Sequence, residues 1–334
     1  MLRPQHPILT VSMAPHVHCG KSIRGHMGET IIALMPAVIM AAMAFGMDAV
    51  RVMALSCAVA VTTEALCNRL AGRDPAVDDL SALLIGLLFA CLLPASAPWW
   101  LVTVGSASAV GLGKAVFGGL GASPLCPPLV GWSICTLSWP KAMDTNATML
   151  GTTLPDPLQL LKYFGADAVA SLTPMSLFTG HQLGGLGAVH VAALLAGGIF
   201  LLIRRHIFWE IPAAFIIGLL TTAWIYQVLD PATHAAPLFH LLTGSTVLGA
   251  FFLATDPASS PIGRIPSLIY GLLAGIMVII IRVYGIYPDG VPFAILLANL
   301  FTPLLDRIRP RPFGGPYILA QEKEDNATCA KHCG

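Results

Sequence analysis

The feature that most constrains this sequence is a series of apolar stretches separated by short polar turns. A helix that crosses the hydrocarbon core of a bilayer needs about 20 consecutive, mostly apolar residues. Ten stretches approach that length, and the third, fifth and eighth are the short ones. They predict an all-α membrane protein with about ten transmembrane helices, at residues 30–46, 49–68, 80–94, 99–117, 126–139, 187–203, 210–229, 238–254, 266–283 and 291–306.

Composition also favours a membrane protein over a soluble one. Only 10% of the 334 residues are charged and 56% are hydrophobic, whereas about 25% of the residues of a soluble domain are charged. The net charge of +1 gives no field that would favour nucleic acid or acidic substrates. The first 25 residues are polar and have no continuous apolar core before their basic residues, so they do not read as a cleaved signal peptide.

The distribution of Lys and Arg predicts the orientation, because cytoplasmic loops carry an excess of both. Trp99, Trp100 and Trp139 fit an aromatic belt at the outer interface. Both termini are then cytoplasmic and the long loop 140–186 lies outside, either as an ordered functional loop or as a disordered spacer. With this orientation, all 18 basic residues fall on the cytoplasmic side except Arg51, Lys141, Lys162 and Arg282.

Ten spans divide into five and five, and an odd number in each half predicts that the halves are inverted in the membrane. The third and eighth stretches, DLSALLIGLLFACLLP (79–94) and HLLTGSTVLGAFFLATDP (240–257), are weakly alike. Short, interrupted helices at equivalent places indicate an inverted repeat with a site between its halves. The predicted parts are a cytoplasmic segment 1–29, a first membrane repeat 30–139, an extracytoplasmic loop 140–186, a second membrane repeat 187–306 and a cytoplasmic tail 307–334.

Ionisable residues inside a membrane are candidates for function. Glu64, Lys114 and Asp256 are the candidates for an ion pathway. Each has a structural alternative: Glu64 as a group at a helix end, Lys114 as a cation that extends to the inner surface, and Asp256 as the cap of a turn. His190 and His240, near span ends, are interpreted as hydrogen-bonded histidines at helix interfaces.

No motif indicates a metal site or a soluble nucleotide-binding fold, because neither a Walker A sequence nor a dinucleotide fingerprint is present. Glycine-rich steps such as 118–121 favour close helix packing. The cysteines of the apolar segments are interpreted as small buried hydrophobes: Cys57, Cys67, Cys91, Cys126 and Cys135. The short His and Cys groups near the two termini offer too few ligands for a metal: His16, His18 and Cys19, and Cys329, His332 and Cys333.

Several stretches together resemble one family, the D subunits of the Rnf electron-transport complex. More distantly, they resemble the B subunit of the Na⁺-translocating NADH:quinone reductase. The resemblance runs from about Pro15 to Phe313, and the segment Ala-Thr-Asp-Pro-x-x-Ser-Pro (254–261) is its most specific part. It is also carried by GGLGASPLCPPLVGWSICTLSWP (118–140), LLIRRHIFWEIPAAFIIG (201–218), HLLTGSTVLGAFFLATDPASSPI (240–262) and YPDGVPFAILLANLFTPLLDR (287–307).

The resemblance implies a cofactor and a place for it. In that family, FMN is attached through its phosphate to a threonine in a motif close to Asp-x-x-Ser-Gly-Ala-Thr-Pro. Here Asp167-Ala-Val-Ala-Ser-Leu-Thr173-Pro174 stands at the matching place, so Thr173 is the expected phosphoester residue, beside Asp167, Ser171 and Pro174. Three positions differ from the motif: Ala170 replaces Ser, Ser171 replaces Gly and Leu172 replaces Ala. The resemblance also allows a second, non-covalent flavin.

By this resemblance, the chain is a membrane subunit of a bacterial inner-membrane ferredoxin:NAD⁺ oxidoreductase that moves Na⁺ or H⁺. It carries covalent FMN, is not catalytic alone, and has as partners a second FMN-carrying subunit and the subunits with Fe–S and NADH sites. Its fold is expected to be similar to that of inverted-repeat channels. One alternative is a stand-alone channel or transporter for a small polar solute, without flavin or partners. Another is a scaffold of the complex whose altered motif no longer accepts FMN.

Overall fold

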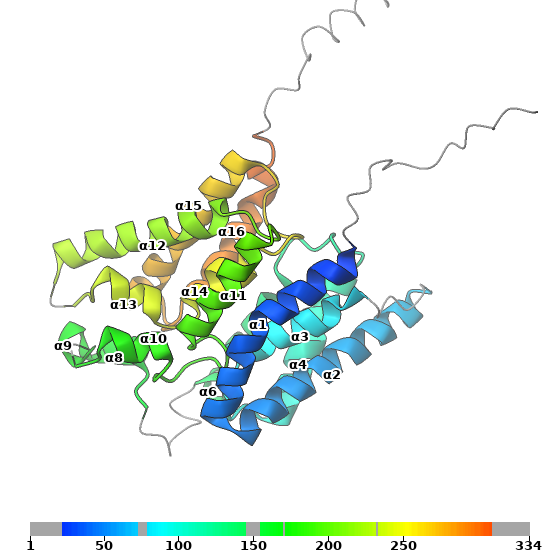
Figure 1. Cartoon of the computed structure of the whole chain (residues 1–334), viewed down its shortest axis with the longest axis horizontal. Coiled ribbons are helices and arrows are strands. Elements are labelled where there is room, and N and C mark those ends of the chain that lie inside the picture. Colours follow the sequence, from blue (N-terminus) through cyan, green and yellow to red (C-terminus); the bar gives the residue numbers. More distant parts are fainter. Residues whose placement is uncertain (1–21, 73–78, 145–153, 170, 232, 309–334) are drawn as a thin grey trace, which may run out of the picture.

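A computed structural model describes residues 22–72, 79–144, 154–169, 171–231 and 233–308, and the described part is helical without strands (Figure 1). Each of the ten predicted segments contains helix in this part. The His and Cys groups near the termini, and Ala170 of the flavin motif, lie outside the described residues. The same holds for most of the predicted segments 1–29 and 307–334.

The first group of helices covers residues 23–138. Ser22 begins it by capping the first helix, where its hydroxyl oxygen accepts a hydrogen bond from the Gly25 N–H. Gly46, at φ 65°, separates the first helix from the second in a conformation that suits glycine. The helices are α1 (Ile23–Phe45), α2 (Met47–Leu70), α3 (Ser81–Leu92), α4 (Trp99–Val110) with its π-helical extension η2 (Gly111–Ala115), and α5 (Pro127–Ser138).

The second group of helices corresponds to the first in chain order, except that its third helix is divided into short pieces. The sequence predicts a short, interrupted helix over 238–254, and the structure places the interruption at residues 243–245. Thr243 is extended and Gly244 has φ 66°, so the helix stops and restarts. The helices are α11 (Val191–Ile203), α12 (Glu210–Leu229), α13 (Pro237–Leu242), α14 (Thr246–Leu248) with π-helical η3 (Gly249–Leu253), α15 (Arg264–Tyr284) and α16 (Val291–Leu305).

The loop between the two groups contains the short helices α6 (Pro140–Met143), α8 (Pro157–Phe164), α9 (Ala166–Val169) and α10 (Pro174–Thr179). Of these, α6 packs on α5 of the first group, and α10 packs on α11 and α13 of the second. The amide of Gln182, which is fully buried, donates to the carbonyl of Leu242 at 3.0 Å. Lys162 donates to the carbonyls of Gly285 and Tyr287. The described part of this loop is therefore docked, and it is not the disordered spacer that was one alternative.

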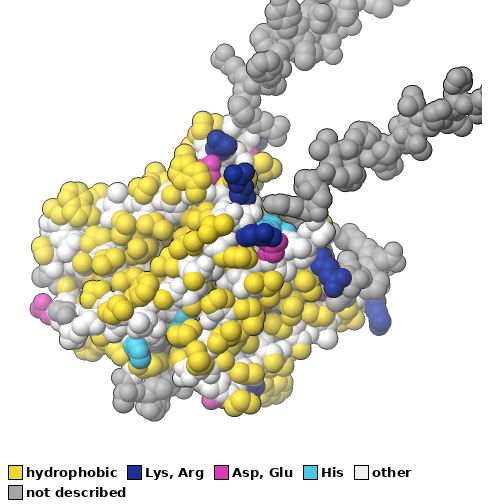
Figure 2. Space-filling view, viewed as in Figure 1, with side chains coloured by type: hydrophobic (Ala, Val, Ile, Leu, Met, Phe, Trp, Pro, Cys, Tyr) yellow, Lys and Arg dark blue, Asp and Glu magenta, His cyan; other side chains and the backbone are white. Residues whose placement is uncertain are grey.

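Four described helices are long and apolar enough to cross a membrane: α1, α2, α12 and α15. Shorter apolar helices accompany them: α3, α11 and α16. Large hydrophobic side chains are exposed on the outside of the molecule, and Figure 2 shows them as a broad surface over both groups of helices. Lys and Arg side chains in that view gather toward the end where α1 begins. This distribution suits a multi-pass membrane protein.

Glycines set how closely the helices pack. The α12–α15 pair makes the most extensive contact between two helices, and Gly218, Gly271 and Gly275 lie in it. A Cβ on Gly275 would stand 2.2 Å from the carbonyl oxygen of Phe215. Such close backbone approach is a known use of small residues between membrane helices.

We expect Gly275→Ala to destabilise the protein, because the added methyl group meets backbone rather than a flexible side chain. Overpacking of this kind costs about 1–3 kcal/mol. The matched control is Gly111→Ala, since a Cβ on Gly111 meets nothing within 4 Å. The measurement is the melting temperature of each purified variant in detergent. Equal melting temperatures for the two variants would contradict the close α12–α15 contact.

Candidate functional site

Two left-handed residues mark the candidate sites, one in each group of helices. Leu80 has φ 61° immediately before α3, and Gly244 has φ 66° shortly before α14. The strain of a non-glycine residue in this region often accompanies function. In each case the next residue is a serine: Ser81 accepts a hydrogen bond from the buried Lys114, and Ser245 is linked to the buried Arg282 through Asp289.

The first cluster joins α2, α3 and η2. Lys114 Nζ donates to the carboxylate of Glu64 and to the hydroxyl of Ser81. The Ser81 N–H and O–H both donate to Asp79 Oδ1, at 2.9 and 2.6 Å. The side chains of Lys114 and Glu64 are only 5% and 7% exposed. Lys114 therefore does not extend to the surface, and Glu64 is not an exposed group at a helix end.

The position of Lys114 depends on the π-helical turn η2, which adds a residue to the turn and is typical of functional places in helices. One carboxylate oxygen of Glu64, Oε2, is buried without a hydrogen-bond partner among the described residues. A small cavity of about 40 Å³ adjoins the cluster and is lined by Ser81, Lys114 and Asp256. The structure thus pairs Lys114 with Glu64 and places Lys114 and Asp256 on the lining of one cavity.

Asp256 lies in the turn after η3. Its carboxylate accepts a hydrogen bond from the Ser259 hydroxyl at 3.0 Å, and its carbonyl accepts from the N–H of Ser260 at 3.0 Å. The capping role predicted as an alternative is consistent with these bonds. The same residue also lines the cavity beside Lys114, so the two interpretations are compatible.

The second cluster contains residues that sequence analysis did not single out for function. Asp289 Oδ2 accepts from the Ser245 N–H at 2.9 Å and from its hydroxyl at 2.5 Å. Arg282 Nη2 lies 3.3 Å from Asp289 Oδ1, and the Arg282 side chain is 3% exposed. The signal in the sequence was a lone Arg at the end of an apolar run, Ile-Ile-Ile-Arg, which the orientation rule counted among the charges on the outer side.

The two histidines differ from their predicted environment. His190 is buried, and neither of its ring nitrogens has a hydrogen-bond partner among the described residues. Its ring instead lies 6.4 Å from that of Phe45. His240 is also buried, with Nδ1 unpartnered in the described part. The interpretation of both as hydrogen-bonded interface residues is wrong for these nitrogens.

The cysteines behave as predicted for small hydrophobes in the described segments. Cys91, Cys126 and Cys135 are buried, Cys57 and Cys67 are partly buried, and all five are free thiols. Within the described ranges, no group of three or more potential ligands is placed to hold a metal ion.

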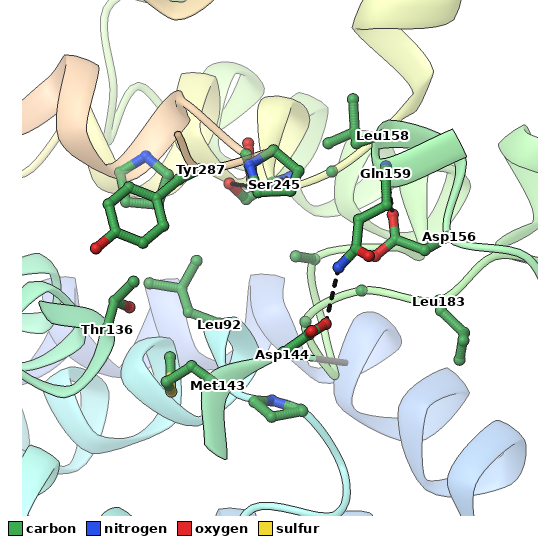
Figure 3. Close-up of a pocket in the computed structure, with 18 of the residues that line it drawn as sticks. Leu92, Thr136, Met143, Asp144, Asp156, Leu158, Gln159, Leu183, Ser245 and Tyr287 are labelled. Atoms are coloured by element: carbon green, nitrogen blue, oxygen red, sulfur yellow. Dashed lines mark hydrogen bonds between the residues drawn. The ribbon is translucent and has the colours of Figure 1, made fainter. Parts of the chain in front are cut away.

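A larger cavity, of about 280 Å³, lies between the two groups of helices beside the docked loop (Figure 3). Tyr287 and Ser245 form one wall, and Leu92, Thr136 and Met143 form the opposite wall. The cavity is mostly apolar with a few polar groups, as is usual for small-molecule sites.

The loop closes the side of this cavity. Leu158, Gln159 and Asp156 come from the start of α8, and Gln159 Nε2 donates to Asp144 Oδ1 at 2.8 Å (Figure 3). Residues 183–185 line it as well. Both flanks of the loop that carries the flavin motif therefore contribute to the cavity.

The expected flavin residue Thr173 is exposed and is the N-cap of α10. Its Oγ1 accepts a weak hydrogen bond from the Ser176 N–H at 3.4 Å, and Pro174 is the first residue of the helix. Asp167 lies on α9 and is exposed, as is Ser171. The Thr173 hydroxyl is therefore accessible to a modifying enzyme, as the expected attachment of a phosphate group requires.

Comparison with known proteins shows the relationship. Residues 10–314 match the sequence model of the NQR2, RnfD, RnfE family. The chain belongs to this family. The match covers the helices and the loop with Thr173, and it confirms the resemblance seen in the sequence.

Individual members of the NQR2, RnfD, RnfE family are similar over almost their whole length. One is the D subunit of the Na(+)-translocating ferredoxin:NAD(+) oxidoreductase complex of Acetobacterium woodii, 38% identical over 321 residues, which covers 94% of this chain and 98% of the relative. Two others are the D subunits of the ion-translocating oxidoreductase complexes of Salmonella newport and Salmonella agona. Each is 34% identical over 347 residues, covering 92% of this chain and 99% of the relative.

Proposed function

We propose that this chain is the D subunit of an ion-translocating ferredoxin:NAD⁺ oxidoreductase complex. The observation that carries the proposal is the agreement in length and sequence with D subunits of ion-translocating oxidoreductase complexes, one of which is named as a ferredoxin:NAD(+) oxidoreductase. Within such a complex the chain is a membrane relay that is not catalytic alone. Its partners are the other subunits, including a second FMN-carrying subunit and those with Fe–S and NADH sites.

We propose Thr173 as the residue that holds FMN through a phosphoester bond. The exposed hydroxyl at the cap of α10 and the adjacent Pro174 support this assignment. When bound, the flavin would supply the ability to accept and donate electrons. The chain's own contribution is to fix the attachment point: Gln182 and Lys162 hold the loop against the second group of helices.

The finer fold proposal is two inverted five-helix repeats, residues 30–139 and 187–306. The contacts support it, because α2 packs on α4 as α12 packs on α15, and α4 packs on α5 as α15 packs on α16. Particular residues also correspond in the two groups. They are Leu80-Ser81 with Gly244-Ser245, the buried Lys114 with the buried Arg282, and Pro128 with Pro292 at the starts of α5 and α16.

An ion pathway between the repeats follows from this correspondence. Lys114, which pairs with Glu64, and Asp256 line one cavity, and Asp289 lines the other, so charged groups stand at both. Buried ionisable groups in a membrane typically mark ion paths. The loop 140–186 then lies on the outer side and both termini in the cytoplasm, in the inner membrane of a bacterium.

The test is a comparison of the purified complex with and without this chain, in vesicles that report ion uptake. We expect reduced ferredoxin to drive NAD⁺ reduction and ion movement only when the chain is present. NAD⁺ reduction at an unchanged rate without the chain would refute the relay. Passage of small polar solutes through vesicles containing the chain alone would favour the stand-alone channel instead.

A further inference from the structure

A third cavity, of about 270 Å³, is lined in part by α8 and differs from the two already described in the charge of its lining. Its polar lining contains two cations, Lys162 from α8 and Arg282 from α15, together with Thr233 and the imidazoles of His234 and His240. None of the described residues that line it is a carboxylate. A cavity of this kind favours an anion.

Two nitrogens of lining residues are buried without a hydrogen-bond partner among the described residues: Arg282 Nε, which is a donor, and His240 Nδ1, which donates in the tautomer that carries its proton there. His240 is 4% exposed and Arg282 is 6% exposed. The other nitrogens of Arg282 are used, since Nη1 donates to the His240 carbonyl at 2.8 Å and Nη2 to Thr246 Oγ1 at 2.8 Å. Because unpartnered buried donors are costly, an acceptor in the cavity would be favourable.

The charges are only partly compensated. Asp289 lies 3.3 Å from Arg282 Nη2, and it lines the neighbouring cavity rather than this one. Lys162 donates to the backbone carbonyls of Gly285 and Tyr287, which carry no formal charge. Partial burial lowers the pKa of Lys162, because the ammonium loses solvent. A bound anion would offset this loss.

The surroundings indicate where the anion comes from. The Tyr226 ring lies 5.3 Å from that of His234 and 6.1 Å from that of Tyr284, which forms an aromatic group beside the cavity. Leu229 and Leu238 nearby in the chain are 74% and 50% exposed. Tyr residues with exposed aliphatic neighbours are typical of the membrane–water interface, where lipid headgroups lie.

We propose that this cavity binds the phosphate of an anionic phospholipid headgroup, with Lys162, Arg282 and His240 as its donors. Phosphate offers several strong acceptor oxygens to Lys and Arg. The proposal concerns residues that are distinct from the Thr173 attachment point and does not depend on it.

The test uses the full-length chain in detergent and two probes, dioctanoyl phosphatidylglycerol and inorganic phosphate, with dioctanoylglycerol as the probe that lacks phosphate. Binding is measured by titration calorimetry and lipid stoichiometry by native mass spectrometry. The variant is Lys162→Gln, and the matched control is Lys141→Gln, an exposed lysine of the same loop outside this cavity. Losing one charge-assisted bond should weaken binding about tenfold or more.

We expect phosphatidylglycerol to bind the unaltered and Lys141→Gln chains alike and Lys162→Gln more weakly, while dioctanoylglycerol does not bind. Equal binding by the two lysine variants would overturn the proposal, provided that their melting temperatures without lipid show both folded. His234→Gln, which changes a half-buried residue of the rim, gives a second test should Lys162→Gln not fold. Inorganic phosphate binding as tightly as the lipid would overturn the lipid as its source.

A further experiment tests whether lipid binding at this cavity is independent of flavin attachment at Thr173. The same titration on Thr173→Ala should give unchanged lipid binding. Binding that occurs only in Thr173→Ala would mean that a phosphate tethered to Thr173 fills the cavity, and it would overturn the lipid assignment. A chain without flavin that still binds lipid would leave this inference standing even if the flavin proposal failed.

Discussion

A Thr173→Ala chain, co-expressed with a flavin transferase, is expected to give no fluorescent band in a denaturing gel, while the unaltered chain fluoresces under ultraviolet light. A phosphoester needs a hydroxyl oxygen, and alanine offers none. The expected effect is therefore complete loss rather than a reduction. The change itself should leave the fold intact, because the Thr173 side chain is exposed and makes one weak capping bond at 3.4 Å. Loss of an N-cap costs about 1 kcal/mol.

Neighbouring hydroxyls provide the controls. Ser171→Ala removes another exposed hydroxyl of the same motif, and Thr179→Ala removes one at the far end of α10. Both variants are expected to remain fluorescent. A band that persists in Thr173→Ala and disappears in Ser171→Ala would move the attachment to Ser171. A dark band for the unaltered chain would mean that the altered motif is not modified, which favours the scaffold or channel alternatives.

The sequence predicts the helices of this protein well because burial in lipid demands long apolar runs. All ten predicted segments contain helix in the described part, and several ends agree within two residues, as for α12 and α16. The details that the sequence did not locate lie where the chain departs from regular helix. Gly244 breaks the predicted segment 238–254, and the π-helical turns η2 and η3 change which side chains face inward. Hydropathy averages over a window and does not detect either change.

The sequence could predict individual residues of the candidate sites, but not which of them lie together in the folded protein. Glu64 and Lys114 are 50 positions apart in the chain, so only the fold shows that they pair. Arg282 was counted as a charge on the outer side, yet it is buried, because the end of α15 is covered by α8 and by residues of α13 and α14. The type of a residue was enough to identify it as a candidate for function. The side chains that it contacts are set by packing between distant segments of the chain, which the sequence does not show.

Disruption of the buried ion pair between Lys114 and Glu64 is expected to have the largest effect on the stability of the protein. Lys114→Met removes the cation and leaves the Glu64 carboxylate buried, with its second oxygen already unpartnered in the described part. Breaking a buried pair from one side typically costs about 3–5 kcal/mol, because the remaining charge is uncompensated. We expect a clearly lower melting temperature in detergent. Arg51→Met is the matched control, since the Arg51–Asp48 pair is 55% and 66% exposed and exposed pairs contribute about 0–1 kcal/mol.

The double variant Glu64→Leu with Lys114→Met separates stability from ion movement. Replacing both members of a buried pair by apolar groups is often neutral, so we expect the double variant to recover most of the stability lost by Lys114→Met. If the pair is part of the ion pathway, the complex with the double variant should still fail to take up ions in vesicles. Full ion uptake by a stable double variant would make the pair structural alone. Loss of uptake at restored stability would instead place it in the path, because folding could no longer explain the defect.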